Sequence, residues 1–102
     1  MKIFGKLVRD KIPEIITKNG ETPIVRTLEK DEYKKELTKK LQEEVTEYLE
    51  SYDVLELADI EEVLRALVEL SGVSYEDFDK MRKEKVEKRG AFKNRVFLES
   101  TK

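Results

Sequence analysis

The 102-residue chain contains no cysteine and no histidine. Without cysteine, neither a disulfide framework nor a thiolate metal site can form. Without histidine, the commonest general base and the commonest transition-metal ligand are both missing. Any metal must therefore be held by oxygen atoms, which favours magnesium, manganese or calcium over zinc.

The sequence also lacks a long apolar run and an N-terminal segment of the secretory type. A membrane-spanning helix needs about 20 mostly apolar residues, and a secretory leader needs an apolar stretch behind a basic start. We therefore expect a soluble, cytoplasmic protein with no membrane partner. No internal repeat, low-complexity tract or linker interrupts the chain, so residues 1–102 are expected to form a single domain.

Charged residues are abundant, at 43% of the chain, and they are unevenly distributed. Residues 29–62 include 13 acidic and 5 basic side chains, a net charge of −8, whereas residues 80–102 include 9 basic and 3 acidic ones, a net charge of +6. An acidic, cation-holding centre together with a basic tail suits a polyphosphate substrate. Proteins that bind nucleic-acid polymers are more often basic overall, so we expect no such partner.

Apolar periodicity and capping residues predict a mainly α-helical fold. The Ser51-Tyr52-Asp53 break separates two long helices, which should form an antiparallel hairpin. Asp31 is the expected N-cap of the first of them, and Ser74 with Asp77 resembles a capping box at the start of a third long helix. The expected helices are a short one at 10–18 and longer ones at 32–51, 54–71 and 74–89.

Short peripheral strands are expected at 22–28 and 95–98, where they could pair with each other. Three substantial helices are one short of a closed bundle. We therefore predict that dimerisation completes a four-helix-bundle-type core from the helix hairpins of a homodimer or higher homo-oligomer.

Each helix of the expected hairpin carries two carboxylates three residues apart, Glu44 with Glu47 and Glu56 with Asp59. Residues at this spacing are neighbours on a helix face, and here both pairs fall on the apolar arc. Ionised carboxylates on a core-facing stripe are costly unless they are paired or bound to a metal. The pattern predicts a cage of oxygen ligands for a divalent cation, although in charged helices such spacings commonly mark only a solvated face.

Basic residues form a second candidate site. On the third long helix, Arg82, Lys85 and Arg89 fall within the apolar arc, where they could bind phosphate or simply extend their charged ends into solvent. The cluster around Arg9 and Lys11 has a similar but weaker claim to phosphate.

The run Glu43-Glu44-Val45-Thr46-Glu47, followed by Glu56-Leu57-Ala58-Asp59, resembles the signature of the all-α nucleoside triphosphate pyrophosphohydrolases. That superfamily includes MazG and phosphoribosyl-ATP pyrophosphohydrolase. The opening motif at 6–13 and the closing motif at 85–98 resemble a small MazG-like branch described as predicted house-cleaning pyrophosphatases. The resemblance covers nearly the whole chain.

The resemblance implies a magnesium-dependent, usually dimeric enzyme that cleaves a nucleotide between its α and β phosphates. Glu44, Glu47, Glu56 and Asp59 would be its metal ligands and catalytic residues, with Glu43 a less certain member. Two features depart from the family pattern. Only eight residues separate the two acidic pairs, and Gly90-Ala91 stands where the family has two glycines.

The expected function is therefore magnesium-dependent, or manganese-dependent, hydrolysis of nucleoside triphosphates to nucleoside monophosphate and pyrophosphate. The resemblance points to removal of non-standard nucleotides. Two alternatives stay open. One is the phosphoribosyl-ATP pyrophosphohydrolase reaction of histidine biosynthesis, and the other is a non-enzymatic helical module whose acidic surface binds a basic partner.

Overall fold

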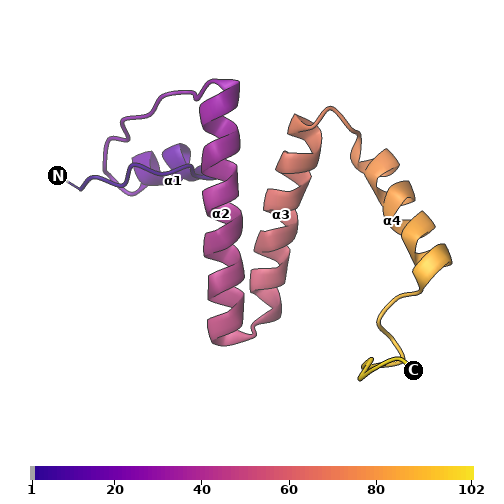
Figure 1. Cartoon of the computed structure of the whole chain (residues 1–102). Coiled ribbons are helices and arrows are strands. Elements are labelled where there is room, and N and C mark those ends of the chain that lie inside the picture. The colour runs from indigo at the N-terminus through magenta and orange to yellow at the C-terminus, as the bar shows by residue number, and fades with distance from the viewer. Residues whose placement is uncertain (1) are drawn as a thin grey trace.

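The computed structural model describes residues 2–102, and in this part of the chain it is mainly helical. The predicted order of a short helix, a helix hairpin and a further long helix is confirmed (Figure 1). The helices are α1 (Ile12–Lys18), α2 (Lys30–Ser51), α3 (Val54–Leu70) and α4 (Tyr75–Arg89).

Helices α2 and α3 lie side by side and antiparallel, joined by a very short turn (Figure 1). Tyr52 ends α2 in the left-handed conformation, with φ of 54°, and its N–H donates to the carbonyl of Tyr48 at 2.7 Å. Asp53 starts α3, because its Oδ1 accepts a hydrogen bond from the N–H of Leu55 at 2.9 Å. This turn brings residues close to the end of α2 level with residues close to the start of α3.

The start of α4 is capped as predicted, since Ser74 Oγ accepts from the N–H of Asp77 at 3.1 Å. The helix leans away from α3 along its length (Figure 1). Near the junction of α3 and α4, the Arg65 guanidinium lies 3.9 Å from the centre of the Tyr75 ring. The C-terminal half of α4 thus stands apart from the α2–α3 hairpin.

The start of α2 differs from the prediction. The helix begins at Lys30 with Glu29 at the N-cap position, and no side chain caps it. Asp31 lies within the first turn, where its charge still favours the positive end of the helix dipole.

The predicted strands at 22–28 and 95–98 are not formed, and residues 2–102 contain no strand. A strand needs a partner for its backbone groups, but the two segments lie on opposite sides of the molecule (Figure 1). Arg95 also has φ of 55°, a left-handed conformation that an extended strand cannot contain.

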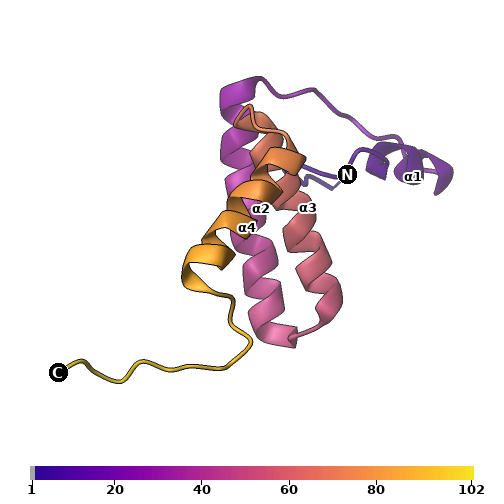
Figure 2. The same ribbon diagram turned by 90° about the vertical axis from the view of Figure 1, so that its right-hand side faces the viewer.

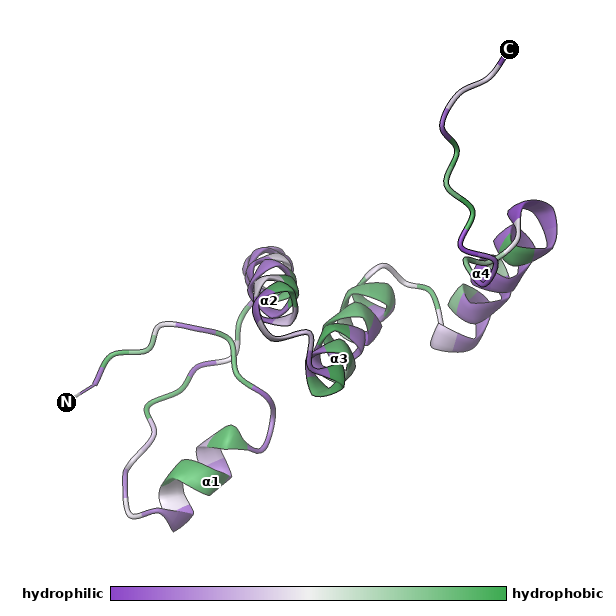
Figure 3. Ribbon diagram, turned by 90° about the horizontal axis from the view of Figure 1, so that it is seen from below, coloured by the Kyte–Doolittle hydropathy of each residue, from purple (hydrophilic) through white to green (hydrophobic). Residues whose placement is uncertain are grey.

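The packing is open. Leu37, at the α2–α3 interface, is the one buried residue of residues 2–102, with 4% of its surface exposed. The radius of gyration is 18.3 Å, compared with about 13 Å for a compact domain of this length. Apolar residues follow α3 on several sides (Figure 3), and the segment after α4 extends away from the helices (Figure 2).

None of the helices within residues 2–102 is both long enough and apolar enough to cross a membrane.

Candidate metal centre

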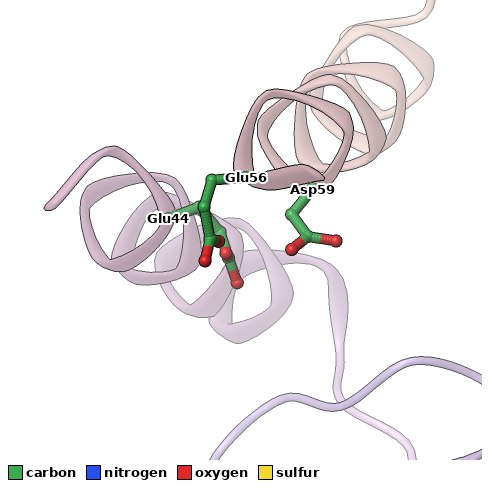
Figure 4. Close-up of side chains that lie close together, drawn as sticks. All are labelled: Glu44, Glu56 and Asp59. Carbon is green, nitrogen blue, oxygen red and sulfur yellow. The ribbon is translucent and has the colours of Figure 1, made fainter. Parts of the chain in front are cut away.

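Three carboxylates from two helices converge near the closed end of the hairpin. Glu44 belongs to α2, while Glu56 and Asp59 belong to α3, and all three are partly buried. One carboxylate oxygen of each lies within 4.8 Å of the other two. Figure 4 shows the three groups directed into the space beside the two helices.

The short turn explains why these residues meet. Glu44 precedes the end of α2 at Ser51 by seven residues, and Asp59 follows the start of α3 at Val54 by five. At a rise of about 1.5 Å per residue, both lie roughly 8–10 Å from the turn. The two acidic positions are therefore nearly level across the hairpin.

Glu44 has the least favourable environment of the three. Its Oε2 is buried and has no hydrogen-bond partner among the described residues. The pKa of Glu44 is raised to about 7, mainly by burial, and then by hydrogen bonding to Glu47 and by repulsion from Glu47 and Asp59. Lys40 acts in the opposite direction and lowers it. A carboxylate oxygen of this kind is an acceptor that a cation could satisfy.

Glu47 lies next to the cluster without belonging to its closest group. The pKa of Glu56 is raised by burial first, and then by the charge of Glu47 and a hydrogen bond with it. Glu47 is thus within reach of both Glu44 and Glu56. Glu43 stands apart, because its side chain is 46% exposed and lies 3.7 Å from Lys40 Nζ.

The N-terminal segment also reaches the cluster. Arg9 Nη2 donates to Asp59 Oδ1 at 2.7 Å, across 50 residues of sequence. A cavity of about 420 Å³ connects Arg9 and Lys11 with the carboxylates. Its lining consists of Leu7, Val8, Arg9, Asp10, Lys11, Tyr33, Leu37, Lys40, Glu44, Asp59, Glu62, Val63 and Ala66.

Sequence reasoning missed two groups in this lining. Lys40 and Tyr33 face the cavity from α2, four and eleven residues before Glu44. Positions separated by three or four residues share a helix face, so the spacing of Lys40 and Glu44 could have identified the lysine. The contact of Arg9 with Asp59 carries no local signal, because it depends on the path of the chain between them.

The predicted basic arc of α4 is not buried within one chain. Arg82, Lys85 and Arg89 are all exposed, and Arg82 Nε donates to Asp79 Oδ1 at 2.9 Å. None of the three lines the cavity beside the carboxylates. In one chain these side chains extend into solvent, one of the two possibilities that the sequence left open, and their contact with phosphate stays a prediction.

The donor set fits a hard divalent cation. All its ligand atoms are carboxylate oxygens, the class that magnesium, manganese and calcium prefer. Two oxygens bound to one magnesium ion at about 2.1 Å can be at most about 4.2 Å apart. The observed limit of 4.8 Å between carboxylate oxygens is close enough for small side-chain rotations to close.

Comparison with known proteins gives a partial match. No protein family model matches the chain, and no solved structure matches it. An uncharacterized protein of Mycolicibacterium smegmatis (strain ATCC 700084 / mc(2)155) is 57% identical over 44 residues, which are 43% of this chain and 45% of that protein. The chain thus matches less than half of that relative's length, and the match assigns no activity.

Proposed function

We propose that this protein is a magnesium-dependent nucleotide pyrophosphohydrolase of the MazG-like type, which cleaves a nucleoside triphosphate to a monophosphate and pyrophosphate. The observation that carries the proposal is the convergence of Glu44, Glu56 and Asp59 within 4.8 Å on facing helices. These are also the positions at which the sequence resembles the acidic signature of that superfamily. A local motif and a non-local arrangement therefore point to the same residues.

We assign two different roles to the carboxylates of this site, cation binding and proton acceptance. Glu44, Glu56 and Asp59 would hold the cation, which would neutralise phosphate charge and polarise the phosphoryl group. Without histidine, the attacking water would be activated by the cation, by a carboxylate, or by both. The carboxylate's part would be to take the proton of that water. We assign this step to Glu47, because it lies against Glu44 and Glu56 but outside their closest group.

The cavity beside the cluster supplies room and positive charge for phosphate groups. At about 420 Å³ it falls within the range of small-molecule sites. Arg9, Lys11 and Lys40 line it together with two of the proposed metal ligands. A polyphosphate can therefore contact the cation and the basic side chains at once, which supports a triphosphate rather than an uncharged ligand.

A second copy of the chain completes the proposed enzyme. Many large apolar side chains of the hairpin are exposed in one chain, including Leu49 at 58% and Leu55 at 69%. The acidic hairpin and the basic C-terminal region also have opposite charge. We propose that the hairpins of two copies pack together, and that Arg82, Lys85 and Arg89 of α4 reach the phosphates bound by the other copy.

The reaction is tested by measuring pyrophosphate release from a panel of standard and modified nucleoside triphosphates and from phosphoribosyl-ATP. Each assay is run with magnesium and with chelator, on the wild type and on Glu56→Gln. Mutation of a residue that only supports a metal ligand typically lowers activity by about 10–100-fold. Loss of Glu56, a proposed direct ligand, should therefore lower activity by at least about 100-fold. Glu61→Gln is the matched control, since it removes an exposed glutamate of α3 that lies 3.9 Å from Arg65.

Magnesium-dependent release that is lost in Glu56→Gln and retained in Glu61→Gln would establish the reaction class. Preference for phosphoribosyl-ATP would move the protein to the histidine-biosynthesis reaction. No release from any nucleotide, with no thermal stabilisation by magnesium and triphosphate, would favour the helical interaction module instead.

A further inference from the structure

Arg9 forms an ion pair with Asp59, one of the proposed metal ligands. Its guanidinium donates to Asp59 Oδ1 at 2.7 Å. Within residues 2–102, this is the one ion pair made by any of the three clustered carboxylates. An oxygen that accepts this strong, charge-assisted hydrogen bond is less able to bind a cation.

The same side chain faces the space where phosphate would lie. Arg9 lines the cavity of about 420 Å³, with Lys11 and Lys40 near it and Glu44 and Asp59 at its edge. The Arg9 side chain is 60% exposed, so no packing fixes it in one orientation. A guanidinium binds a carboxylate and a phosphate with the same planar fork of donors, and Arg9 can exchange one for the other by rotating its side chain.

We propose that Arg9 is an internal counter-ion of the metal-free cluster, displaced from Asp59 by a divalent cation and then bound to a phosphate of the metal-bound polyphosphate. This role rests on the proposed function. In this proposal, metal alone breaks the contact between Arg9 and Asp59, whereas metal and polyphosphate together break it and replace it. The two ligands therefore bind cooperatively, and part of their coupling passes through Arg9.

The test measures two affinities that should change in opposite directions. Isothermal titration calorimetry gives the dissociation constant of Mn²⁺ alone, and then that of inorganic pyrophosphate at saturating Mn²⁺, for the wild type, Arg9→Ala and Arg9→Lys. An exposed ion pair is worth up to about 1 kcal/mol, so Arg9→Ala should bind Mn²⁺ alone about three- to fivefold more tightly. It should bind pyrophosphate at least about tenfold more weakly, because a charge-assisted contact is lost. Arg9→Lys should fall between the two.

Two control variants distinguish the effect of the Arg9–Asp59 contact from the general effect of removing a positive charge. Lys11→Ala removes a positive charge from the same cavity wall, and no ion pair joins Lys11 to the cluster. It should tighten Mn²⁺ binding clearly less than Arg9→Ala does, because Lys11 acts on the cluster only through a longer-range, partly screened interaction. Arg26→Ala removes an arginine that contacts Glu32 at 2.7 Å, the same distance as in the Arg9 pair, and neither affinity should change.

Each contrary result has a distinct meaning. Mn²⁺ affinity that is unchanged or weaker in Arg9→Ala, while the wild type binds Mn²⁺, would overturn the role of Arg9 and leave the metal centre standing. Equal tightening in Lys11→Ala would also overturn it, because general electrostatics would then explain the gain. No Mn²⁺ binding by the wild type or any variant would remove the proposed metal centre, and the role of Arg9 with it.

Discussion

Glu44 has the most strongly perturbed environment of the three clustered carboxylates. One of its oxygens is buried without a hydrogen-bond partner, and burial together with Glu47 and Asp59 raises its pKa to about 7 from an ordinary value of 4.5. The pKa of Glu44 is higher in the folded protein than in the unfolded chain. Protonation of Glu44 therefore stabilises the folded state. Its contribution to stability is full below about pH 4.5 and is lost as the pH rises towards 7.

Glu44→Gln should remove this pH dependence, because glutamine keeps the shape of the protonated acid and cannot ionise. In chelator, we expect the variant to unfold at a higher temperature than the wild type at pH 8, and at nearly the same temperature at pH 4.5. Thermal unfolding followed by circular dichroism measures both. Glu43→Gln, which replaces a neighbour outside the cluster, is the control, and equal behaviour of the two variants would contradict the prediction.

The residues of the site differ in how far the sequence could predict them. Glu44, Glu47, Glu56 and Asp59 were identifiable because their spacing is local and the turn between the helices is short. The contact of Arg9 with Asp59 was not, because it depends on how 50 intervening residues fold.

At the scale of elements, α3 depends on Asp53, the N-cap residue directly before it. Asp53 Oδ1 accepts from the Leu55 N–H at 2.9 Å and satisfies one of the free donors at the helix start. Because α3 carries Glu56 and Asp59 in its first two turns, this cap also sets the position of two proposed metal ligands.

Asp53→Ala should lower the free energy of unfolding by about 1 kcal/mol, the usual cost of losing an N-cap. Asp31→Ala is the matched control, because Asp31 lies in the first turn of α2 without capping it and should cost only a few tenths of a kcal/mol through the helix dipole. Urea denaturation at one protein concentration measures both. Equal losses would contradict the assignment of Asp53 as the cap.

Helices and strands also differ in how predictable they were. The ends of α3 and α4 followed from local signals such as Ser74 and the break at 51–53. The strands expected at 22–28 and 95–98 had suitable residues but needed a partner that the fold does not bring to them. Whether the basic arc on α4 is covered likewise depends on what packs against that helix, which periodicity alone does not show.

At the scale of the whole molecule, the chain leaves much of its apolar surface uncovered. Leu37 is the one buried residue in the described region, and the radius of gyration of 18.3 Å is that of an open arrangement. Burial of apolar surface is the main driving force of folding. A second copy that covers the hairpin would supply what one chain lacks.

Light scattering coupled to size-exclusion chromatography should therefore show at least a dimer at micromolar concentration, with a mass of 24 kDa or more from chains of 12.0 kDa each. Leu49→Asp should shift the protein towards monomer, because Leu49 is 58% exposed on the hairpin and would lie in the interface. Ile24→Asp is the control, since Ile24 is 90% exposed outside the hairpin. A wild type that is only monomeric would contradict the proposed assembly.

The central claim, that these carboxylates form a divalent-metal centre, is tested most directly by locating the ion. Crystals grown with Mn²⁺ and measured at the manganese absorption edge give an anomalous difference map. We predict a strong peak bonded to carboxylate oxygens of Glu44, Glu56 and Asp59, with the Arg9 guanidinium moved away from Asp59. A map with no peak among these three residues, in crystals that contain manganese elsewhere, would contradict the claim.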